Sequence, residues 1–261
     1  MEGDLQKEKN HKQKQKKIIR KNKMRSIFLT ILATVFFLGC AAPEKKRETV
    51  FYPMPPDKPR LQFLVSITGE EDIGEKPGAF QDFLLGKHPS MKRIARPAYL
   101  AAVKGKIYIS DRTYKKILIL DLKNKKFDYI RAEKEVAISD PAGIWVTRDE
   151  VKYVADMKRM QVMVFGKDNK FLRTYGRKDQ FDKPVDVAVY KNRIYVCDQN
   201  RNMIIVLDKD TGKTIQTIGE TGAEEGKMYK PSHVKVDHEG NIYVNDNFNF
   251  RIQMFDPRGS F

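Results

Sequence analysis

The sequence predicts an all-β fold, a β-propeller built from four-stranded blades. Two observations support this prediction: a unit of short alternating strands occurs four times, and its period lies in the forties. The clearest copy covers residues 230–261 and begins near Pro231. Apolar residues alternate through Val234 and Val236 and lead to a turn at Gly240. Alternation on both sides of a glycine turn is typical of antiparallel strands.

Landmark residues of this unit recur upstream at similar intervals. A proline opens each copy, 43 to 47 residues after the one before: Pro97, Pro141, Pro184 and Pro231. An aspartate ends the second predicted strand of each copy: Asp111, Asp156, Asp198 and Asp246. A single sheet of this kind cannot bury both of its faces, so the copies are expected to pack side by side around a common axis.

The best-defined copy resembles the NHL repeat family of β-propellers. The resemblance lies in Pro231, residues 240–244 (Gly-Asn-Ile-Tyr-Val), Asp246 and residues 251–256 (Arg-Ile-Gln-Met-Phe-Asp). It extends over about residues 60–261 and is clearer in the last three copies than in the first. Members of this family generally have six blades, so the resemblance implies a six-bladed ring. It implies no particular activity, because the matching residues are those that build blades.

The two ends of the repeat region bear on the number of blades. Residues 171–176 and 214–219 follow the third strand of their copies and are predicted to be outer strands. Residues 60–69 have the same pattern, and we expect this strand to complete the last blade of the ring. Phe261 lies where the outer strand of the fourth copy should begin. We therefore expect a truncated piece of a six-bladed ring, and the alternative is a closed four-bladed ring.

Part of the formal charge of +16 lies near the N-terminus, where residues 1–25 contain ten lysines and arginines and three acidic residues. Lysine-rich runs of this kind are usually solvated, and we expect no nucleic-acid partner. Residues 24–39 then have the parts of a secretory signal: a basic Arg25, a twelve-residue apolar stretch and a small residue. Twelve residues are too few to cross a bilayer as a helix. This order suggests that Met24 is the true start, with residues 1–23 as a polybasic extension upstream of it.

Residues 37–40 (Phe-Leu-Gly-Cys) resemble a bacterial lipobox. The resemblance implies cleavage before Cys40, a diacylglycerol group on its sulfur, and an exported protein held to a membrane of the bacterial cell envelope. The alternative is a plain signal peptide with an incidental cysteine. Residues 40–59 contain five prolines and are expected to form an extended spacer, followed by the propeller over residues 60–261. Cys197, the other cysteine, is interpreted as a small strand residue.

Four residues occupy one structural position, two residues after each repeat proline: Tyr99, Gly143, Asp186 and His233. We expect them to surround one end of the central channel. An aspartate and a histidine at such a place can hold a divalent metal or act as acid and base. Related propellers include lyases and lactonases, so a metal-assisted lyase or hydrolase is the alternative function. Asp186 and His233 are too few ligands for a convincing metal site, and we predict no catalytic residue and no cofactor.

The loops after the four repeat aspartates are rich in cations and amides, and we predict that they form one binding surface at the rim. Together with Tyr99, Asp186 and His233, its polar residues are Arg112, Lys115, Lys116, Lys158, Arg159, Gln199, Asn200, Arg201, Asn202, Asn247, Asn249 and Arg251. The aspartates themselves are expected to accept hydrogen bonds from backbone amides of the turns. The predicted function is therefore a binding scaffold for a protein or an anionic envelope glycan. The alternative is that the loops are simply solvated, and the sequence predicts no oligomeric state.

Overall fold

The computed structural model describes residues 50–54, 56–74, 92–130, 136–177 and 179–261. The expected signal segment, Cys40 and the start of the spacer lie outside these ranges. The chain divides into two compact units, residues 1–64 and 65–261. In the described ranges, no helix combines the length and the apolar character that a membrane crossing needs.

The first unit contains one small pair of strands. Strand β1 (Phe51–Tyr52) pairs antiparallel with β2 (Leu61–Gln62). The sequence predicted an outer strand over residues 60–69. In the structure, β2 is the only named strand in this range, and it pairs with β1. A partner separated by a short loop is reached at a small entropic cost, which favours this local pairing over a distant one.

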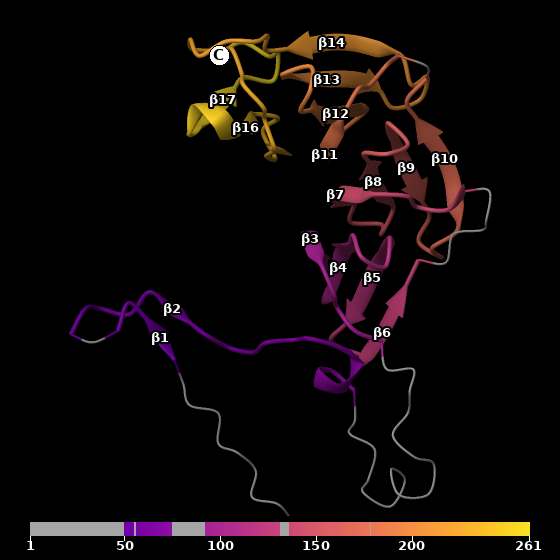
Figure 1. Cartoon of the computed structure of the whole chain (residues 1–261), viewed down its shortest axis with the longest axis vertical. Helices are drawn as coiled ribbons and strands as arrows, with labels where there is room; N and C mark the ends of the chain where they lie inside the picture. Colours follow the sequence, from indigo (N-terminus) through magenta and orange to yellow (C-terminus); the bar gives the residue numbers. More distant parts are fainter. Residues whose placement is uncertain (1–49, 55, 75–91, 131–135, 178) are drawn as a thin grey trace, which may run out of the picture. The chain divides into compact units, whose positions relative to one another are not determined.

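The second unit contains four antiparallel sheets, one for each copy of the sequence unit (Figure 1). The first sheet consists of β3 (Pro97–Val103), β4 (Lys106–Asp111), β5 (Lys116–Asp121) and β6 (Lys126–Tyr129). The second consists of β7 (Pro141–Val146), β8 (Lys152–Asp156), β9 (Gln161–Phe165) and β10 (Phe171–Tyr175). The third consists of β11 (Pro184–Tyr190), β12 (Arg193–Asp198), β13 (Met203–Asp208) and β14 (Thr214–Ile218). The fourth has three strands: β15 (His233–Val236), β16 (Ile242–Asp246) and β17 (Arg251–Phe255).

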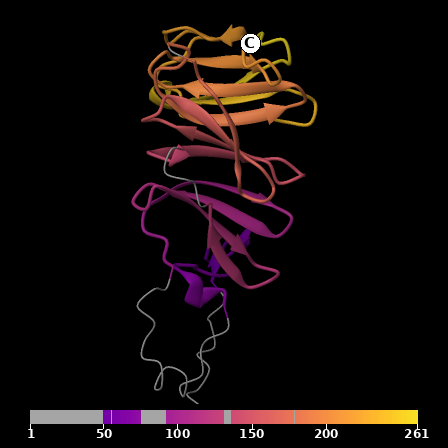
Figure 2. The same ribbon diagram turned by 90° about the vertical axis from the view of Figure 1, so that its right-hand side faces the viewer.

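The sheets are arranged as the blades of a propeller, which confirms the predicted fold class. The innermost strand of each sheet contacts that of the next: β3 contacts β7, β7 contacts β11, and β11 contacts β15. Figure 1 shows β3, β7 and β11 on the inner side of the arc and β6, β10 and β14 on its outer side. In Figure 2 the first three sheets follow one another in the order of the sequence, and the fourth overlaps the third in this view.

The repeated landmarks lie where the sequence pattern predicts. Pro97, Pro141 and Pro184 are the first residues of the inner strands β3, β7 and β11. The first position of a strand suits proline, which has no amide hydrogen to donate to a neighbouring strand. In the fourth copy the inner strand begins two residues after Pro231, at His233. Each repeat aspartate is the last residue of the second strand of its sheet.

Apolar layers between neighbouring sheets hold the blades together. Tyr195, Ile204 and Val206 on the third sheet pack in one cluster with Val234 and Val244 of the fourth. Similar layers join the first sheet to the second and the second to the third. Burying one such side chain completely contributes about 1.5–3 kcal/mol. The core therefore depends on the faces of the strands and leaves the loops at the strand ends available for recognition.

One lysine is buried inside the second blade. Lys152 in β8 is 1% exposed, and its Nζ donates hydrogen bonds to the carbonyl oxygens of Gly166 (2.8 Å) and Lys167 (3.2 Å). Burial lowers the pKa of Lys152 from 10.5 to about 8. The unfolded chain therefore binds this proton more tightly than the folded protein does. The buried charge lowers the free energy of unfolding at neutral pH, and this loss is recovered as the pH rises from 8 to 10.5.

We expect the free energy of unfolding of the wild-type protein to rise by about 2–3 kcal/mol relative to that of Lys152→Met between pH 7 and pH 10. The methionine variant keeps the length of the side chain and removes the titrating amine. Urea unfolding of both proteins at several pH values measures this difference. Parallel pH dependences would show that Lys152 titrates alike in the folded and unfolded chains.

Candidate functional site

The repeat aspartates fix the loops at one end of the blades. Asp156 is fully buried, and its Oδ1 accepts hydrogen bonds from the backbone amides of Asp140 (3.1 Å), Lys158 (3.2 Å) and Arg159 (3.0 Å). Its Oδ2 accepts one from the amide of Ser139 at 2.6 Å. The carboxylate thus ties the loop after β8 to the segment before β7. The predicted role as acceptor for amides of the following turn is confirmed for Asp111, Asp156 and Asp198 but not for Asp246, and the second tie was not predicted.

The same arrangement recurs in the neighbouring blades, with one variation. Asp111 and Asp198 each accept amides from both segments in the same way. Asp246 accepts only one of these backbone amides and is otherwise bonded to side chains. Its remaining partners are the side chains of Asn249, Arg251 and Gln253. Arg251 therefore forms an ion pair with a buried carboxylate, at 3.0 Å.

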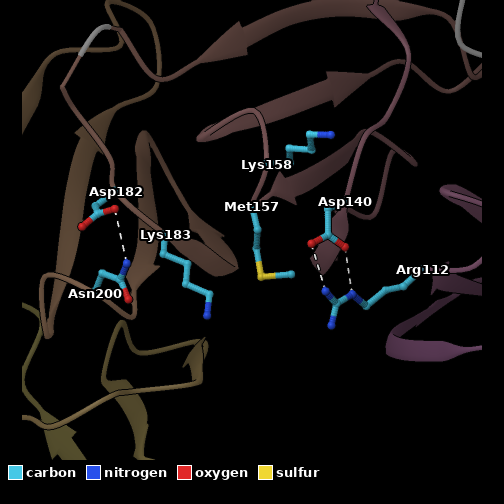
Figure 3. A pocket seen from close by; sticks show the side chains of 7 residues that line it. All are labelled: Arg112, Asp140, Met157, Lys158, Asp182, Lys183 and Asn200. Atoms are coloured by element: carbon cyan, nitrogen blue, oxygen red, sulfur yellow. Dashed lines mark hydrogen bonds and ion pairs between the residues drawn. The ribbon is translucent and has the colours of Figure 1, made fainter.

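A polar cavity of about 430 Å³ lies at this end of the blades (Figure 3). Its lining comes from equivalent positions of the first three blades, just before the repeat proline or just after the repeat aspartate. The lining residues are Arg112, Asp140, Met157, Lys158, Asp182, Lys183 and Asn200. Because the repeat aspartates hold both segments, the walls of the cavity are fixed by buried hydrogen bonds.

Each wall of the cavity contains a carboxylate that accepts hydrogen bonds from another lining residue. Arg112 donates two parallel hydrogen bonds to Asp140, from Nε to Oδ1 (2.8 Å) and from Nη2 to Oδ2 (2.9 Å), and so links the first blade to the second. The pair raises the pKa of Arg112, which remains a cation. On the other wall Asn200 donates to Asp182 at 3.3 Å. Figure 3 shows Lys183 extending from this wall, with Met157 between it and Arg112.

Four predicted channel residues meet in two pairs. The rings of Tyr99 and His233 lie 4.9 Å apart between centroids, and the Tyr99 hydroxyl donates to the carbonyl oxygen of Ser232 at 3.2 Å. A Cβ added to Gly143 would lie 2.0 Å from Oδ1 of Asp186, so this carboxylate fills the space that a side chain at Gly143 would need. Burial, and next the charge of Asp186, raise the pKa of Tyr99 far above its usual range, which keeps the phenol neutral.

Asp186 is a buried member of an ion pair between the third and fourth blades. Its Oδ2 accepts hydrogen bonds from the amide of Val234 (3.1 Å) and from Nζ of Lys235 (2.9 Å). Burial raises the pKa of Asp186, against the opposing effect of Lys235. Nδ1 of His233 lies 2.9 Å from the hydroxyl of Ser232. A metal ion at this carboxylate would have to compete with Lys235, and the described residues contain no group of three potential ligands.

The other predicted rim residues lie in the loops but mainly stabilise them. Arg159 donates to the carbonyl oxygen of Ala137 at 2.7 Å, and Arg201 donates to that of Asp179. Asn249 donates to Gly222 at 2.9 Å. Arg251 is paired with Asp246, Asn247 is exposed, and Arg112, Lys158 and Asn200 line the cavity.

Sequence reasoning missed the residues just before the repeat proline. Asp140 and Lys183 hold that position and line the cavity, whereas only the loops after the aspartates were predicted to form the surface. The sequence contained the signal that could have found them, because Asp140 and Lys183 directly precede the repeat prolines Pro141 and Pro184.

Residues 178–261 match the family model DUF5128, described as a 6-bladed beta-propeller. The E3 ubiquitin-protein ligase TRIM71 of Rattus norvegicus is 38% identical over 80 residues, which is 31% of this chain and 8% of that protein. Protein brain tumor of Drosophila melanogaster is 27% identical over 131 residues, 48% of this chain and 12% of that protein. The chain therefore spans about a tenth of the length of these relatives. The matches support the predicted propeller and its resemblance to NHL repeats.

Two solved structures share the architecture. A streptogramin B lyase has a TM-score of 0.52 at 17% identity, with 63% of this chain and 52% of that chain covered. The hydrazine synthase of Kuenenia stuttgartiensis has a TM-score of 0.50 at 16% identity, with 66% and 48% covered. At such identities the likeness concerns the fold alone. The chain is thus a β-propeller of which residues 178–261 match a family of six-bladed propellers.

Proposed function

We propose that this protein is an exported, lipid-anchored binding scaffold whose propeller rim holds a protein or an anionic glycan of the bacterial cell envelope. The observation that carries the binding role is the polar cavity at the blade ends. Its lysines, Lys158 and Lys183, have no carboxylate within ion-pair distance among the described residues. The lipid anchor rests on the lipobox-like residues 37–40.

The rigid walls of the cavity suit a binding role. The segments that carry Lys158 and Lys183 are tied by buried carboxylates, Asp156 and Asp198. A surface that is already ordered loses little conformational entropy when a partner binds. A scaffold of this kind therefore retains more of its interaction energy as affinity than a mobile loop would.

The chemistry of the channel supports binding over catalysis. Asp186 is paired with Lys235, and one ring nitrogen of His233 is engaged by Ser232. Oδ1 of Asp186 has no hydrogen-bond partner, but a metal-assisted lyase or hydrolase needs further ligands, and the described residues contain no group of three His, Cys, Asp or Glu side chains that could hold an ion. The similarity to an E3 ubiquitin-protein ligase, whose name states that it acts on proteins, supports a protein among the possible partners.

Site-specific photo-crosslinking in the native host tests the proposal. A photoreactive residue at position 183 is expected to yield a discrete crosslinked partner in the membrane fraction, because Lys183 lines the cavity. Position 213 is the matched control, since Lys213 is an exposed lysine beside the outer strand of the same blade. Equal crosslinking from the two positions would count against a rim-specific partner.

A further inference from the structure

We propose that the cavity binds the carboxylate of an acidic side chain on a polypeptide partner, between Lys183 and Arg112. This inference rests on the proposed binding function and names the chemical class of the partner. It concerns one place on the rim, and it can be tested separately from the identity of the natural partner.

The free donors of the cavity point to a carboxylate. Arg112 uses Nε and Nη2 for Asp140, which leaves Nη1 without a hydrogen bond among the described residues. In Figure 3 this remaining nitrogen and the amine of Lys183 point toward the same open side of the cavity. A planar guanidinium and an ammonium group together supply charge-assisted donors, which are among the strongest hydrogen-bond donors in proteins.

The charge balance of the cavity agrees with a single anionic group. Asp140 is matched by Arg112, whereas Lys183 and Lys158 have no ion-pair partner in the described part of the chain. One carboxylate next to Lys183 therefore gains an ion pair without displacing an existing one. Asp140 and Asp182 line the same cavity and repel a second carboxylate placed inside it, so the cavity takes one carboxylate of a polypeptide at a time.

The apolar part of the lining favours a polypeptide over an anionic glycan. Met157 lies between Lys183 and Arg112, and its flexible thioether can pack against the methylene groups of a glutamate or aspartate. A sugar would place hydroxyl groups against the same thioether. An anionic glycan would therefore be attracted by the lysines at the rim but would lack the packing against Met157.

Binding of labelled hexaglutamate and hexaglutamine peptides to the full chain tests the inference. Fluorescence anisotropy at low salt is expected to give at least tenfold tighter binding of hexaglutamate. The Lys183→Gln variant is expected to weaken hexaglutamate binding five- to tenfold, and the control Lys213→Gln less than twofold. Arg112→Lys, which keeps the charge and loses the fork, is expected to weaken binding, with its thermal unfolding measured to verify the fold.

Three results would overturn the inference. Equal effects of Lys183→Gln and Lys213→Gln would indicate general attraction to a basic protein. Tighter binding of a glucuronic-acid oligosaccharide than of hexaglutamate would replace the polypeptide by a glycan. Absence of hexaglutamate binding would exclude the carboxylate site, while a partner crosslinked from position 183 would still support the proposed scaffold.

Discussion

Replacing Asp156 by alanine is expected to lower the free energy of unfolding by about 3–5 kcal/mol. The carboxylate is fully buried and accepts four backbone amides, which alanine would leave without their acceptor. The amides belong to two segments, which are otherwise joined by a backbone hydrogen bond from Met157 to Asp140 (3.1 Å) and by the Arg159 side chain. The loss should therefore be larger than that of a single hydrogen bond between neutral groups.

Asp168→Ala is the matched control for this prediction. Asp168 lies in the same blade, its side chain is 58% exposed, and it accepts a hydrogen bond from the amide of Lys170. We expect its replacement to cost less than about 1 kcal/mol. Urea unfolding can be followed by the fluorescence of Trp145, the single tryptophan, which lies in β7 next to the affected segment. Equal losses for the two variants would show that Asp156 is an ordinary turn residue.

Asp156→Asn separates charge from shape. An amide side chain has one acceptor oxygen, and its NH₂ group would face amides that are themselves donors. We expect the asparagine variant to be less stable than wild type and more stable than the alanine variant. The position of the asparagine variant between the other two proteins therefore measures how much of the stabilisation depends on the second carboxylate oxygen and its charge.

The repeat spacing predicted the strands because that signal is local. Alternating side chains and glycine turns are set by neighbours in the sequence. Three of the four repeat aspartates, Asp111, Asp156 and Asp198, accept the same turn amides. The outer strand predicted at residues 60–69 differs, because a strand pattern does not specify its partner. Here Leu61 and Gln62 pair with β1, which is close in sequence.

The candidate site depended more on contacts between blades. Arg112 was predicted for the surface, but its partner Asp140 comes from the next blade, and no spacing within one repeat reveals such a pair. Arg251 was predicted as a rim cation and instead pairs with Asp246, which receives only one of the backbone amides that the other repeat aspartates receive. The sequence of one repeat therefore predicts positions, whereas the charge presented at the rim depends on neighbouring loops.

The contact between Gly143 and Asp186 leads to the second large prediction. We expect Gly143→Ala to lower the free energy of unfolding by about 3 kcal/mol. An added Cβ would lie 2.0 Å from Oδ1 of Asp186 and 2.4 Å from its Cα. Rotation of the carboxylate relieves only the first of these contacts. The second involves the backbone of β11, so the inner strands of the second and third blades would have to separate.

Two comparisons make the Gly143 prediction specific. Gly166→Ala is the control, because its added Cβ would meet only side chains, the nearest being Oδ1 of Asp168 at 3.0 Å; we expect a loss below about 1 kcal/mol. In an Asp186→Ala background, Gly143→Ala should remain destabilising, since the Cα of residue 186 stays in place. Full relief in that background would locate the clash at the carboxylate alone. Separation of the blades also moves Lys183 away from Arg112, so Gly143→Ala should weaken hexaglutamate binding even at temperatures where the variant remains folded.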